Sequence, residues 1–388
     1  MNSVAKILVV DDEPDLEILL RQKFRRKIRS GALTLIFAQN GVEALEQLKT
    51  HDDVDMVLSD INMPQMDGLT LLHQLNELNR DLRAVIVTAY GDMKNIRTAM
   101  NRGAFDFITK PIDFSDLETT IAKTLAHLEV MREALRSRDE LVAIRRELGV
   151  AARMQESILP TVFPTDTRFE IHASMTPALE VGGDFYDFFR LEDDKMGIVM
   201  ADVSGKGVPA ALFMMVSRTL MKGTAIGEAD PATAVAEVNR LLVESNEESM
   251  FVTLFYATFN PVSGLLEFAN GGHNLPYVVR TDGSVEQIDC DSGIVLAVLP
   301  GFEFPGGAIE LEPGDVVFFY TDGITEAMNE AGEEFGDDAL AEVLEQVAGS
   351  NAEAFSERVV DAVRVHAGEA PQSDDITCLC LRYARTED

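Results

Sequence analysis

The chain has 388 residues, 46% hydrophobic and 26% charged, a composition typical of soluble globular proteins with room for two or three domains. Its formal net charge is −33, and residues 151–388 hold 13 Lys and Arg against 42 Asp and Glu, which disfavours direct nucleic-acid binding by that part. The first residues lack the apolar core of a signal peptide, and no apolar run reaches the ~18–20 residues that a membrane span needs, so a cytoplasmic location is expected.

The three cysteines, Cys290, Cys378 and Cys380, form no disulfide framework. Cys378 and Cys380 are two residues apart in "ITCLCLRYA", so on a strand they would share one face. We expect buried, reduced thiols in a cytosolic protein, with metal ligation as the less favoured alternative.

Short apolar runs rich in β-branched residues alternate with helical patterns over the first 115 residues. The strand-like runs are "KILVV", "LTLIFA", "DMVLSD", "RAVIVTA" and "FDFIT". Five strands separated by helices predict an α/β fold, a doubly wound five-stranded parallel sheet with helices on both faces.

Residues 114–157 form one long helical pattern with little interruption. Its apolar residues recur at three- and four-residue steps or their multiples through Leu117, Ile121, Leu128, Met131 and Leu135, and after a phase shift through Leu141, Ile144 and Leu148. A long helix with one apolar stripe and charged flanks usually pairs with another helix, so a coiled-coil linker and a homodimer are predicted. The alternative is a linker that lies on its own domains.

From residue 168 onward short strand-like runs dominate, interrupted by helical patterns at 208–222, 231–246, 337–348 and 352–367. This pattern predicts an α+β domain, an antiparallel β sandwich flanked by helices. We therefore expect three parts: residues 1–126, the helix 114–157, and residues 158–388.

Polar residues follow the predicted strands of the first part at their carboxyl ends. They are Asp11 and Asp12 after the first run, Asp60 after the third, Thr88 at the end of the fourth and Lys110 after the fifth. In a doubly wound sheet, ligands bind at this edge, so these side chains should converge. Clustered carboxylates there suit Mg²⁺, and a carboxylate held beside a lysine can accept a phosphoryl group.

Residues 5–126 resemble the receiver domain of two-component response regulators through "VVDDEP", "LSDINMPQMDG", "VTAYG" and "FITKP". The resemblance implies Asp60 as the phosphoacceptor and an upstream histidine kinase as the phosphoryl source. It implies that Mg²⁺ binds to Asp12, Asp60 and the carbonyl of Asn62, with Asp11 completing the acidic pair. It also implies that Thr88 and Lys110 contact the phosphoryl group and that Phe107 is the switching aromatic residue. A degenerate receiver that no longer accepts phosphate is the alternative.

Aspartates also stand beside strand-like runs in the second half. They occur in "VGGDFYD" (Asp184), "MADVSGKG" (Asp202), "FYTDGITEA" (Asp322) and "QSDDIT" (Asp374 and Asp375). Oxygen-only ligands from scattered strands suit Mg²⁺ or Mn²⁺, and no Cys/His spacing fits Zn²⁺. Two such ions could activate a water for attack on phosphorus. Asp184 is thus expected to face a metal site.

Residues from about 145 to 384 are similar to the PPM-type protein serine/threonine phosphatases of the bacterial sporulation-stage-II-E branch. The matching motifs are "ARMQESILP", "VGGDFYD", "ADVSGKGVPAAL", "ANGGHNLP", "YTDGITEA" and "SDDIT". The similarity implies two Mn²⁺ or Mg²⁺ ions, held by Asp202 as the bridging ligand, the carbonyl of Val203, Asp322, either Asp374 or Asp375, and Asp184 directly or through water.

Two further residues of these motifs have competing interpretations. His273 in "NGGHNLP" could be a general acid for the leaving serine or threonine oxygen, but a structural, hydrogen-bonding histidine is favoured. Asp187, three residues after Asp184, is expected to support the fold rather than bind a metal.

Together these features predict a response regulator whose phosphorylation at Asp60 controls a metal-dependent serine/threonine protein phosphatase. The resemblance implies a phosphorylated anti-sigma factor antagonist as the protein substrate. The rival hypothesis is a catalytically weak, phosphorylation-gated adaptor that sequesters a regulatory partner. A transcription factor would need a DNA-binding effector, and the acidic half contains no helix-turn-helix or basic face.

Overall fold

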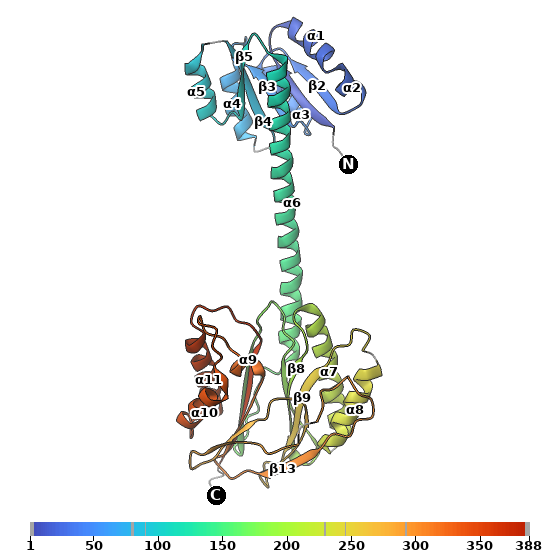
Figure 1. Cartoon of the computed structure of the whole chain (residues 1–388), viewed down its shortest axis with the longest axis vertical. Coiled ribbons are helices and arrows are strands. Elements are labelled where there is room, and N and C mark those ends of the chain that lie inside the picture. Colours follow the sequence, from blue (N-terminus) through green and yellow to red (C-terminus); the bar gives the residue numbers. More distant parts are fainter. Residues whose placement is uncertain are drawn as a thin grey trace. The chain divides into compact units, whose positions relative to one another are not determined.

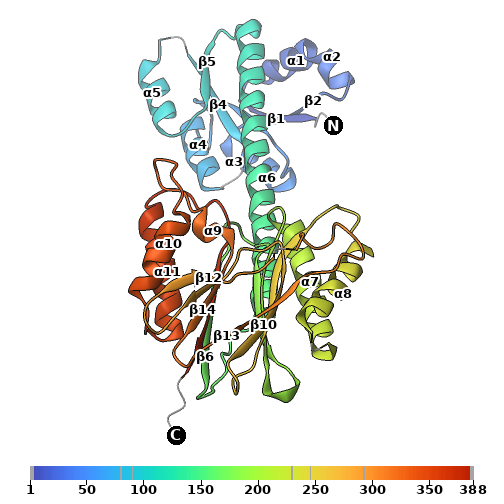
Figure 2. The ribbon, with the colours of Figure 1, turned by 60° about the horizontal axis from the view of Figure 1, so that its bottom comes forward.

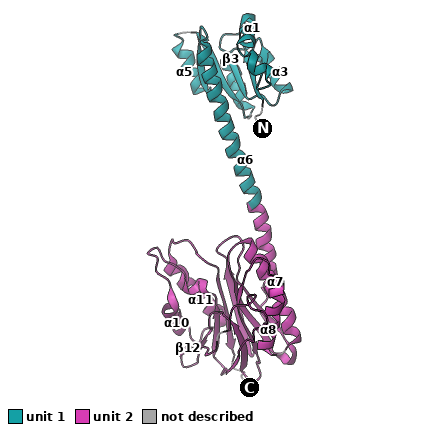
Figure 3. Cartoon of the chain, turned by 45° about the vertical axis from the view of Figure 1, so that its right-hand side comes forward, with its two compact units in different colours: residues 1–144 teal, residues 145–388 magenta. Residues whose placement is uncertain are grey.

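The computed structural model describes residues 4–78, 81–89, 91–228, 230–244, 246–291 and 293–384. The chain divides into two compact units, Met1–Ile144 and Arg145–Asp388, which Figure 3 shows in different colours. The division falls within one continuous helix, α6 (Phe114–Ile158). None of the helices in the described ranges combines the length and the apolar character that crossing a bilayer requires.

A five-stranded parallel sheet forms the centre of the first unit, in the order β2-β1-β3-β4-β5 (Figure 1). Its strands are β1 (Ala5–Val10), β2 (Leu33–Ala38), β3 (Met56–Asp60), β4 (Arg83–Ala89) and β5 (Asp106–Lys110). Its other helices are α1 (Pro14–Lys23), α2 (Arg25–Arg29), α3 (Gly41–Thr50), α4 (Gly68–Glu77) and α5 (Met93–Asn101). The predicted doubly wound fold is confirmed.

The unbroken apolar runs of these strands follow from burial on both faces. Alternate side chains of β1 enter different cores: Leu8 and Val10 pack on the α3 and α4 side, whereas Ile7 and Val9 pack on the α1 and α6 side. Successive strand residues point to opposite faces, so a sheet covered twice needs apolar residues at every position.

The N-terminal part of α6 belongs to the core of the first unit. Leu117 and Ile121 pack in the same cluster as β1 and α1, and Leu128 is also buried. Arg132 then binds the Asp55 carboxylate at 2.6 Å and the Asp81 carbonyl at 2.8 Å. The prediction that Leu117, Ile121 and Leu128 contact a second helix is therefore wrong, because these side chains are already buried within one chain.

Apart from these docked residues, α6 presents apolar side chains to solvent. Val130 is 67% exposed, Leu141 60% and Ile144 53%. Val130 and Ile144 are fourteen residues apart, two heptads, and Leu141 lies three residues before Ile144, so the three follow a coiled-coil repeat. This stripe is exposed, unlike the one that begins at Leu117.

Two five-stranded antiparallel sheets form the second unit, in the orders β13-β10-β9-β8-β7 and β12-β11-β14-β15-β6. The first consists of β7 (Phe185–Arg190), β8 (Met196–Val203), β9 (Val252–Phe259), β10 (Leu265–Gly271) and β13 (Gly306–Glu310). The second consists of β6 (Phe169–Thr176), β11 (Tyr277–Val279), β12 (Val285–Gln287), β14 (Val316–Tyr320) and β15 (Ile376–Tyr383). The predicted antiparallel sandwich with flanking helices is confirmed.

Aromatic and aliphatic side chains fill the space between the sheets, where Phe255 of β9 lies 5.8 Å from Phe319 of β14 between ring centroids. Figure 2 shows α7 (Val208–Gly227) and α8 (Pro231–Glu244) outside the first sheet, with α10 (Gly336–Gln346) and α11 (Ala352–Ala367) outside the second. Two short helices, η1 (Glu192–Asp194) and α9 (Asp322–Thr325), complete the unit. Of the helix predicted at 231–246, residue 245 lies outside the described residues.

Candidate functional site

Three acids of the first unit meet at the carboxyl edge of its sheet. Asp60 is the last residue of β3, and Asp11 and Asp12 follow β1. Their ligand oxygens all lie within 4.8 Å of one another, a grouping that can hold a metal ion. Asp11 and Asp60 are buried, whereas Asp12 and Asn62 are exposed. Burial raises the pKa of Asp11, with the nearby Asp60 charge acting in the same direction.

Lys110 connects these acids from the end of β5. Its Nζ lies 2.8 Å from Asp60 Oδ2 and 3.0 Å from Asp11 Oδ2, and it also reaches Glu13 at 3.2 Å. The Thr88 hydroxyl, at the end of β4, is buried and has no hydrogen-bond partner among the described residues. A buried, unpaired hydroxyl is costly unless a ligand completes it. Acids, ammonium and hydroxyl thus form a site suited to a cation and a phosphoryl group.

Phe107 lies on β5 close to this site along the chain, and its side chain is 37% exposed. The structure places Asp11, Asp12, Asp60 and Lys110 together, as the sequence predicted, with Thr88 at the end of the neighbouring strand.

A second group of acids lies at strand ends in the second unit. Asp202 is near the end of β8, Asp322 opens α9 after β14, Asp374 precedes β15 and Asp184 precedes β7. Burial, followed by the charge of Asp322, raises the pKa of Asp202 to about 7, and Asp374 and Asp375 act in the same direction. Burial and the charges of Asp202 and Asp375 raise the pKa of Asp184 well above its usual value. These acids are close enough to repel one another, as expected where a cation belongs.

These acids do not form so tight a group as those of the first unit. Within the described ranges, the Asp11, Asp12 and Asp60 trio is the only set of three acidic, His or Cys side chains whose ligand atoms all lie within 4.8 Å. Lys206 contacts this second group, with its Nζ 2.9 Å from Asp374 Oδ2.

Asp374 and Asp375 have different surroundings, which spacing alone could not distinguish. Asp375 is buried and accepts hydrogen bonds from three backbone amides: Ala178 at 2.8 Å, Gly183 at 2.7 Å and Asp184 at 3.2 Å. Both of its oxygens therefore hold the loop that carries Asp184. Asp374 is half-buried and faces Lys206.

The two glycines of "VGGD" are required by the closeness of this loop to its neighbours. A Cβ on Gly182 would lie 2.4 Å from Asp375 Oδ2, and one on Gly183 would lie 2.8 Å from the Val203 carbonyl oxygen. Both distances are far below van der Waals contact. Glycine therefore allows the Asp184 loop to approach Asp375 and the carbonyl of Val203.

Asp184 and Asp187, three residues apart in one run, have unlike partners. Asp187 is 1% exposed and pairs with Arg218 of α7 at 2.8 Å, with Lys222 at 3.7 Å. Asp184 instead accepts a hydrogen bond from the Thr321 hydroxyl at 2.7 Å, beside Asp322. Asp187 thus joins α7 to β7, as expected of a residue that supports the fold.

His273 is buried with both ring nitrogens engaged. Nδ1 lies 2.8 Å from the Thr253 hydroxyl and Nε2 lies 3.0 Å from the Tyr320 carbonyl oxygen. Burial lowers the pKa of His273 to about 4, so the ring is neutral at physiological pH. Nε2 therefore donates to the carbonyl and Nδ1 accepts from Thr253. These contacts join β9 to the end of β14 and favour the structural role over the general acid.

Sequence reasoning missed one residue, Gln155 near the end of α6. Its Nε2 donates to the Gly182 carbonyl at 2.6 Å, and its Oε1 accepts from the Gly182 amide at 3.0 Å. Gln155 is buried, although Met154 and Glu156 on either side are exposed. A polar residue in a helix gives no signal of burial by itself, and the motif "ARMQESILP" does not indicate which of its side chains is buried. The paired bonds fix the loop that leads into Asp184.

These two sites and folds define a class of protein, a receiver domain followed by a phosphatase of PP2C type. The family model for the response regulator receiver domain matches residues 7–122, and the model for stage II sporulation protein E (SpoIIE) matches residues 192–384. The chain therefore belongs to the response regulators, and its second unit is a SpoIIE-type protein serine/threonine phosphatase domain.

Individual relatives match one part or the other. Phosphoserine phosphatase RsbU of Bacillus subtilis is 29% identical over 240 residues, covering 62% of this chain and 70% of that protein. Sporulation initiation phosphotransferase F of the same species is 34% identical over 120 residues, covering 31% of this chain and 93% of that protein. Several other curated relatives are longer, and the chain covers 26% to 41% of their length.

Among solved structures, the SiaA-PP2C domain of Pseudomonas aeruginosa aligns with a TM-score of 0.56 at 24% sequence identity. The alignment covers 63% of this chain and 98% of that domain. At this identity the likeness establishes the fold of the second unit.

Proposed function

We propose that this protein is a two-component response regulator in which phosphorylation of Asp60 controls a metal-dependent phosphoserine and phosphothreonine protein phosphatase. The observation that carries the proposal is the presence of two acidic sites on one chain. One holds Asp60 against Lys110 at 2.8 Å, and the other gathers Asp184, Asp202 and Asp322 with raised pKa values.

In the receiver, Mg²⁺ would be held by Asp12, Asp60 and the carbonyl of Asn62, with Asp11 beside them. The cluster of oxygen ligands within 4.8 Å suits a hard cation. Lys110 would neutralise the transferred phosphoryl group, and the unpaired Thr88 hydroxyl would donate to it. Phe107 would change its exposure when Thr88 moves toward that group. A histidine kinase would supply the phosphoryl group.

In the phosphatase, Mn²⁺ or Mg²⁺ would be held by Asp202, the Val203 carbonyl, Asp322 and Asp374, with Asp184 direct or through water. We choose Asp374 over Asp375 because Asp375 already accepts three backbone hydrogen bonds. The wider spread of these acids would leave room for two divalent ions. When bound, the ions would supply an activated water and positive charge for the phosphoryl oxygens.

The substrate would be a phosphorylated anti-sigma factor antagonist. The similarity to a protein named phosphoserine phosphatase RsbU supports a phosphoserine substrate. The chain's thiols support a thiol-independent mechanism: Cys378 and Cys380 are buried on a central strand, where burial raises their pKa values.

The proposal is tested by adding beryllofluoride, a phosphoryl mimic, to the full chain and following p-nitrophenyl phosphate hydrolysis with Mn²⁺. The rate of the wild type should change several-fold, and Asp60→Ala should abolish that response while retaining Mn²⁺-dependent hydrolysis, because Asp60 lies in the other unit. Asp67→Ala, an exposed acid that caps α4, is the matched control and should respond as the wild type does. If the full chain shows no hydrolysis that depends on Mn²⁺ and is abolished by EDTA, the adaptor hypothesis is favoured.

Regulation through α6 would involve a homodimer, with the stripe of Val130, Leu141 and Ile144 as the contact between helices. Leu141→Glu combined with Ile144→Glu should convert a dimer to a monomer and remove the beryllofluoride response, because two buried charges would oppose the pairing. Val142→Glu, also exposed but off the stripe, should remain dimeric. Light scattering measures the mass; a monomeric wild type in both receiver states would exclude this mode of control.

A further inference from the structure

A groove of about 360 Å³ lies beside the proposed metal site of the second unit. Its lining is largely apolar and includes Ala327, Met328, Val363, Ala367 and Ile376, with Arg364 and Asp374 among its polar members. We call it the α9–α11 groove, after the helices that contribute Gly323 (α9) and Val363 and Ala367 (α11) to its lining. Figures 1 and 2 show both helices on one side of the unit. The volume falls in the lower part of the range of about 300–1,000 Å³ that ligand pockets occupy.

The groove continues to the proposed metal site along the chain itself. Asp374 and Ser373 are among its lining residues, and Gly323, which also lines it, directly follows Asp322. A phosphoryl group bound at Asp322 and Asp374 would therefore place neighbouring parts of its substrate at the mouth of the groove. The occupant that this geometry favours is the segment that carries the phosphorylated residue.

Hydrogen bonds hold the wall of the groove near Asp374 in place. Gln372 Nε2 donates to the carbonyls of Thr176 at 2.8 Å and Asp374 at 2.7 Å. The Lys206 ammonium contacts the Ser373 carbonyl as well as the Asp374 carboxylate. This wall is fixed to β6 and to the loop before α7.

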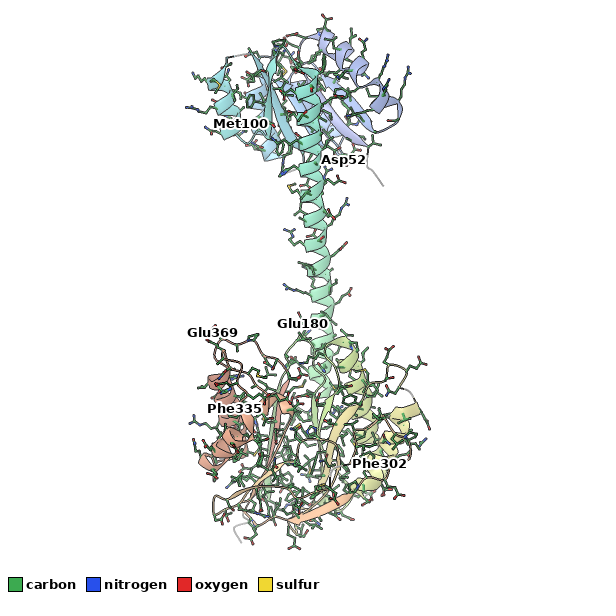
Figure 4. All side chains as sticks on the ribbon, in the orientation of Figure 1. Asp52, Met100, Glu180, Phe302, Phe335 and Glu369 are labelled. Atoms are coloured by element: carbon green, nitrogen blue, oxygen red, sulfur yellow. The ribbon has the colours of Figure 1, made fainter. Side chains whose placement is uncertain are left out.

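The lining residues at the end of α11 are held in place by contacts between this end of the helix and the turn before α10. His366 Nε2 donates to the Glu333 carbonyl at 3.1 Å, and its ring lies 5.4 Å from that of Phe335. The Glu369 amide donates to Glu330 Oε1 at 3.3 Å. Figure 4 labels Phe335 and Glu369 on this side of the unit. With both parts of the lining tied down, binding would cost little ordering of the protein.

Charge alone would not bring a phosphoprotein to this unit. Residues 151–388 hold 13 Lys and Arg against 42 Asp and Glu, so long-range electrostatics oppose an anionic substrate. Affinity for the protein part of the substrate must then come from short-range contacts, and contacts remote from the reacting group can promote the reaction. An apolar groove at the edge of the site supplies such a contact.

We propose that the α9–α11 groove binds an apolar side chain of the phosphoprotein substrate, within about four residues of the phosphorylated serine or threonine. This inference rests on the proposed phosphatase function and adds to it a determinant of substrate specificity. One apolar side chain in such a pocket changes kcat/KM by roughly 10- to 200-fold.

The test uses the full chain with Mn²⁺ and nine-residue phosphoserine peptides of Gly and Ser, with one Leu placed at each position in turn. At one position Leu should raise kcat/KM about tenfold over the peptide without Leu. Ala367→Trp, which fills the groove, should reduce that gain to less than about twofold. Val365→Trp, on the same helix but 83% exposed, is the matched control and should keep the gain.

Hydrolysis of p-nitrophenyl phosphate, which is too small to reach into the groove, reports on the metal site and on folding. If Ala367→Trp loses this activity, Met328→Glu serves as the test of the groove instead. Met328 is partly exposed, so the protein should tolerate the change, and a charge at this position should also remove the gain from Leu. The groove assignment alone would be overturned by either of two results. In the first, p-nitrophenyl phosphate is hydrolysed but kcat/KM is equal for all peptides; in the second, the gain in kcat/KM from Leu survives in both variants. Hydrolysis of neither substrate would overturn the proposed function with it.

Discussion

Asp202→Asn should reduce Mn²⁺-dependent hydrolysis of p-nitrophenyl phosphate by at least about 100-fold. Asp202 lies among Asp184, Asp322 and Asp374. Burial and the charges of neighbouring acids raise the pKa values of Asp184, Asp202 and Asp322. The substitution removes one negative charge from the residue proposed to bridge two ions. Loss of a residue that only orients a metal ligand already costs 10- to 100-fold, so loss of the bridging ligand should cost more.

The control is Asp193→Asn, which makes the same chemical change at an exposed acid in η1 and should leave the rate unaltered. Phosphorylation of Asp60 should proceed normally in both variants, because Asp60 lies in the first unit. Retention by Asp202→Asn of more than roughly a tenth of the wild-type activity would exclude the bridging role.

Thermal unfolding gives a second readout of the same substitution. The folded-state pKa of Asp202, about 7, lies above the value of roughly 3.9 in an unfolded chain. The folded metal-free protein therefore binds more protons between these values, and its stability should fall as the pH rises from about 4 through 7. Asp202→Asn should lessen this loss, so in EDTA at pH 8 it should melt above the wild type. Mn²⁺ should raise the melting temperature of the wild type and have less effect on the variant.

The receiver site could be predicted from the sequence because its parts are placed by the sheet. Asp11, Asp60, Thr88 and Lys110 each end or follow a parallel strand, and the carboxyl ends of such strands lie at one edge. Once five strands are recognised, the contact between Lys110 and Asp60 follows. The acids of the second unit could be named by motif, but the antiparallel order that gathers them could not be derived from spacing.

What the sequence could not supply were contacts between residues far apart in the chain. The cation that neutralises Asp187 is Arg218 of α7, 31 residues later, and no pattern within "VGGDFYD" indicates it. The different roles of Asp374 and Asp375 depend on amides almost 200 residues earlier. The pairing predicted for α6 through Leu117 and Leu128 is wrong because periodicity predicts an apolar face without specifying what covers it.

Gln155 provides the second large expected effect. Gln155→Leu removes both hydrogen bonds to Gly182 and leaves a buried amide and carbonyl without partners, which costs about 1–3 kcal/mol for each group. Gly182 lies two residues before Asp184, and its neighbour Gly183 donates to Asp375. The loop would shift away from the geometry that positions Asp184, so hydrolysis should fall about 10- to 100-fold.

Because Gln155 belongs to α6, the same variant tests how the receiver controls the phosphatase. The helix that packs Leu117 into the receiver core also carries Gln155 to the Asp184 loop. If the state of the receiver is passed along α6, this paired hydrogen bond is where it acts on the site, and Gln155→Leu should lose the beryllofluoride response even with excess Mn²⁺. Met154→Leu, the exposed neighbour, should keep both the rate and the response. A Gln155→Leu protein could instead be slow and still respond several-fold to beryllofluoride. That result would place the point of control elsewhere on the catalytic domain, because Gln155 would then position the loop without transmitting the state of the receiver to it.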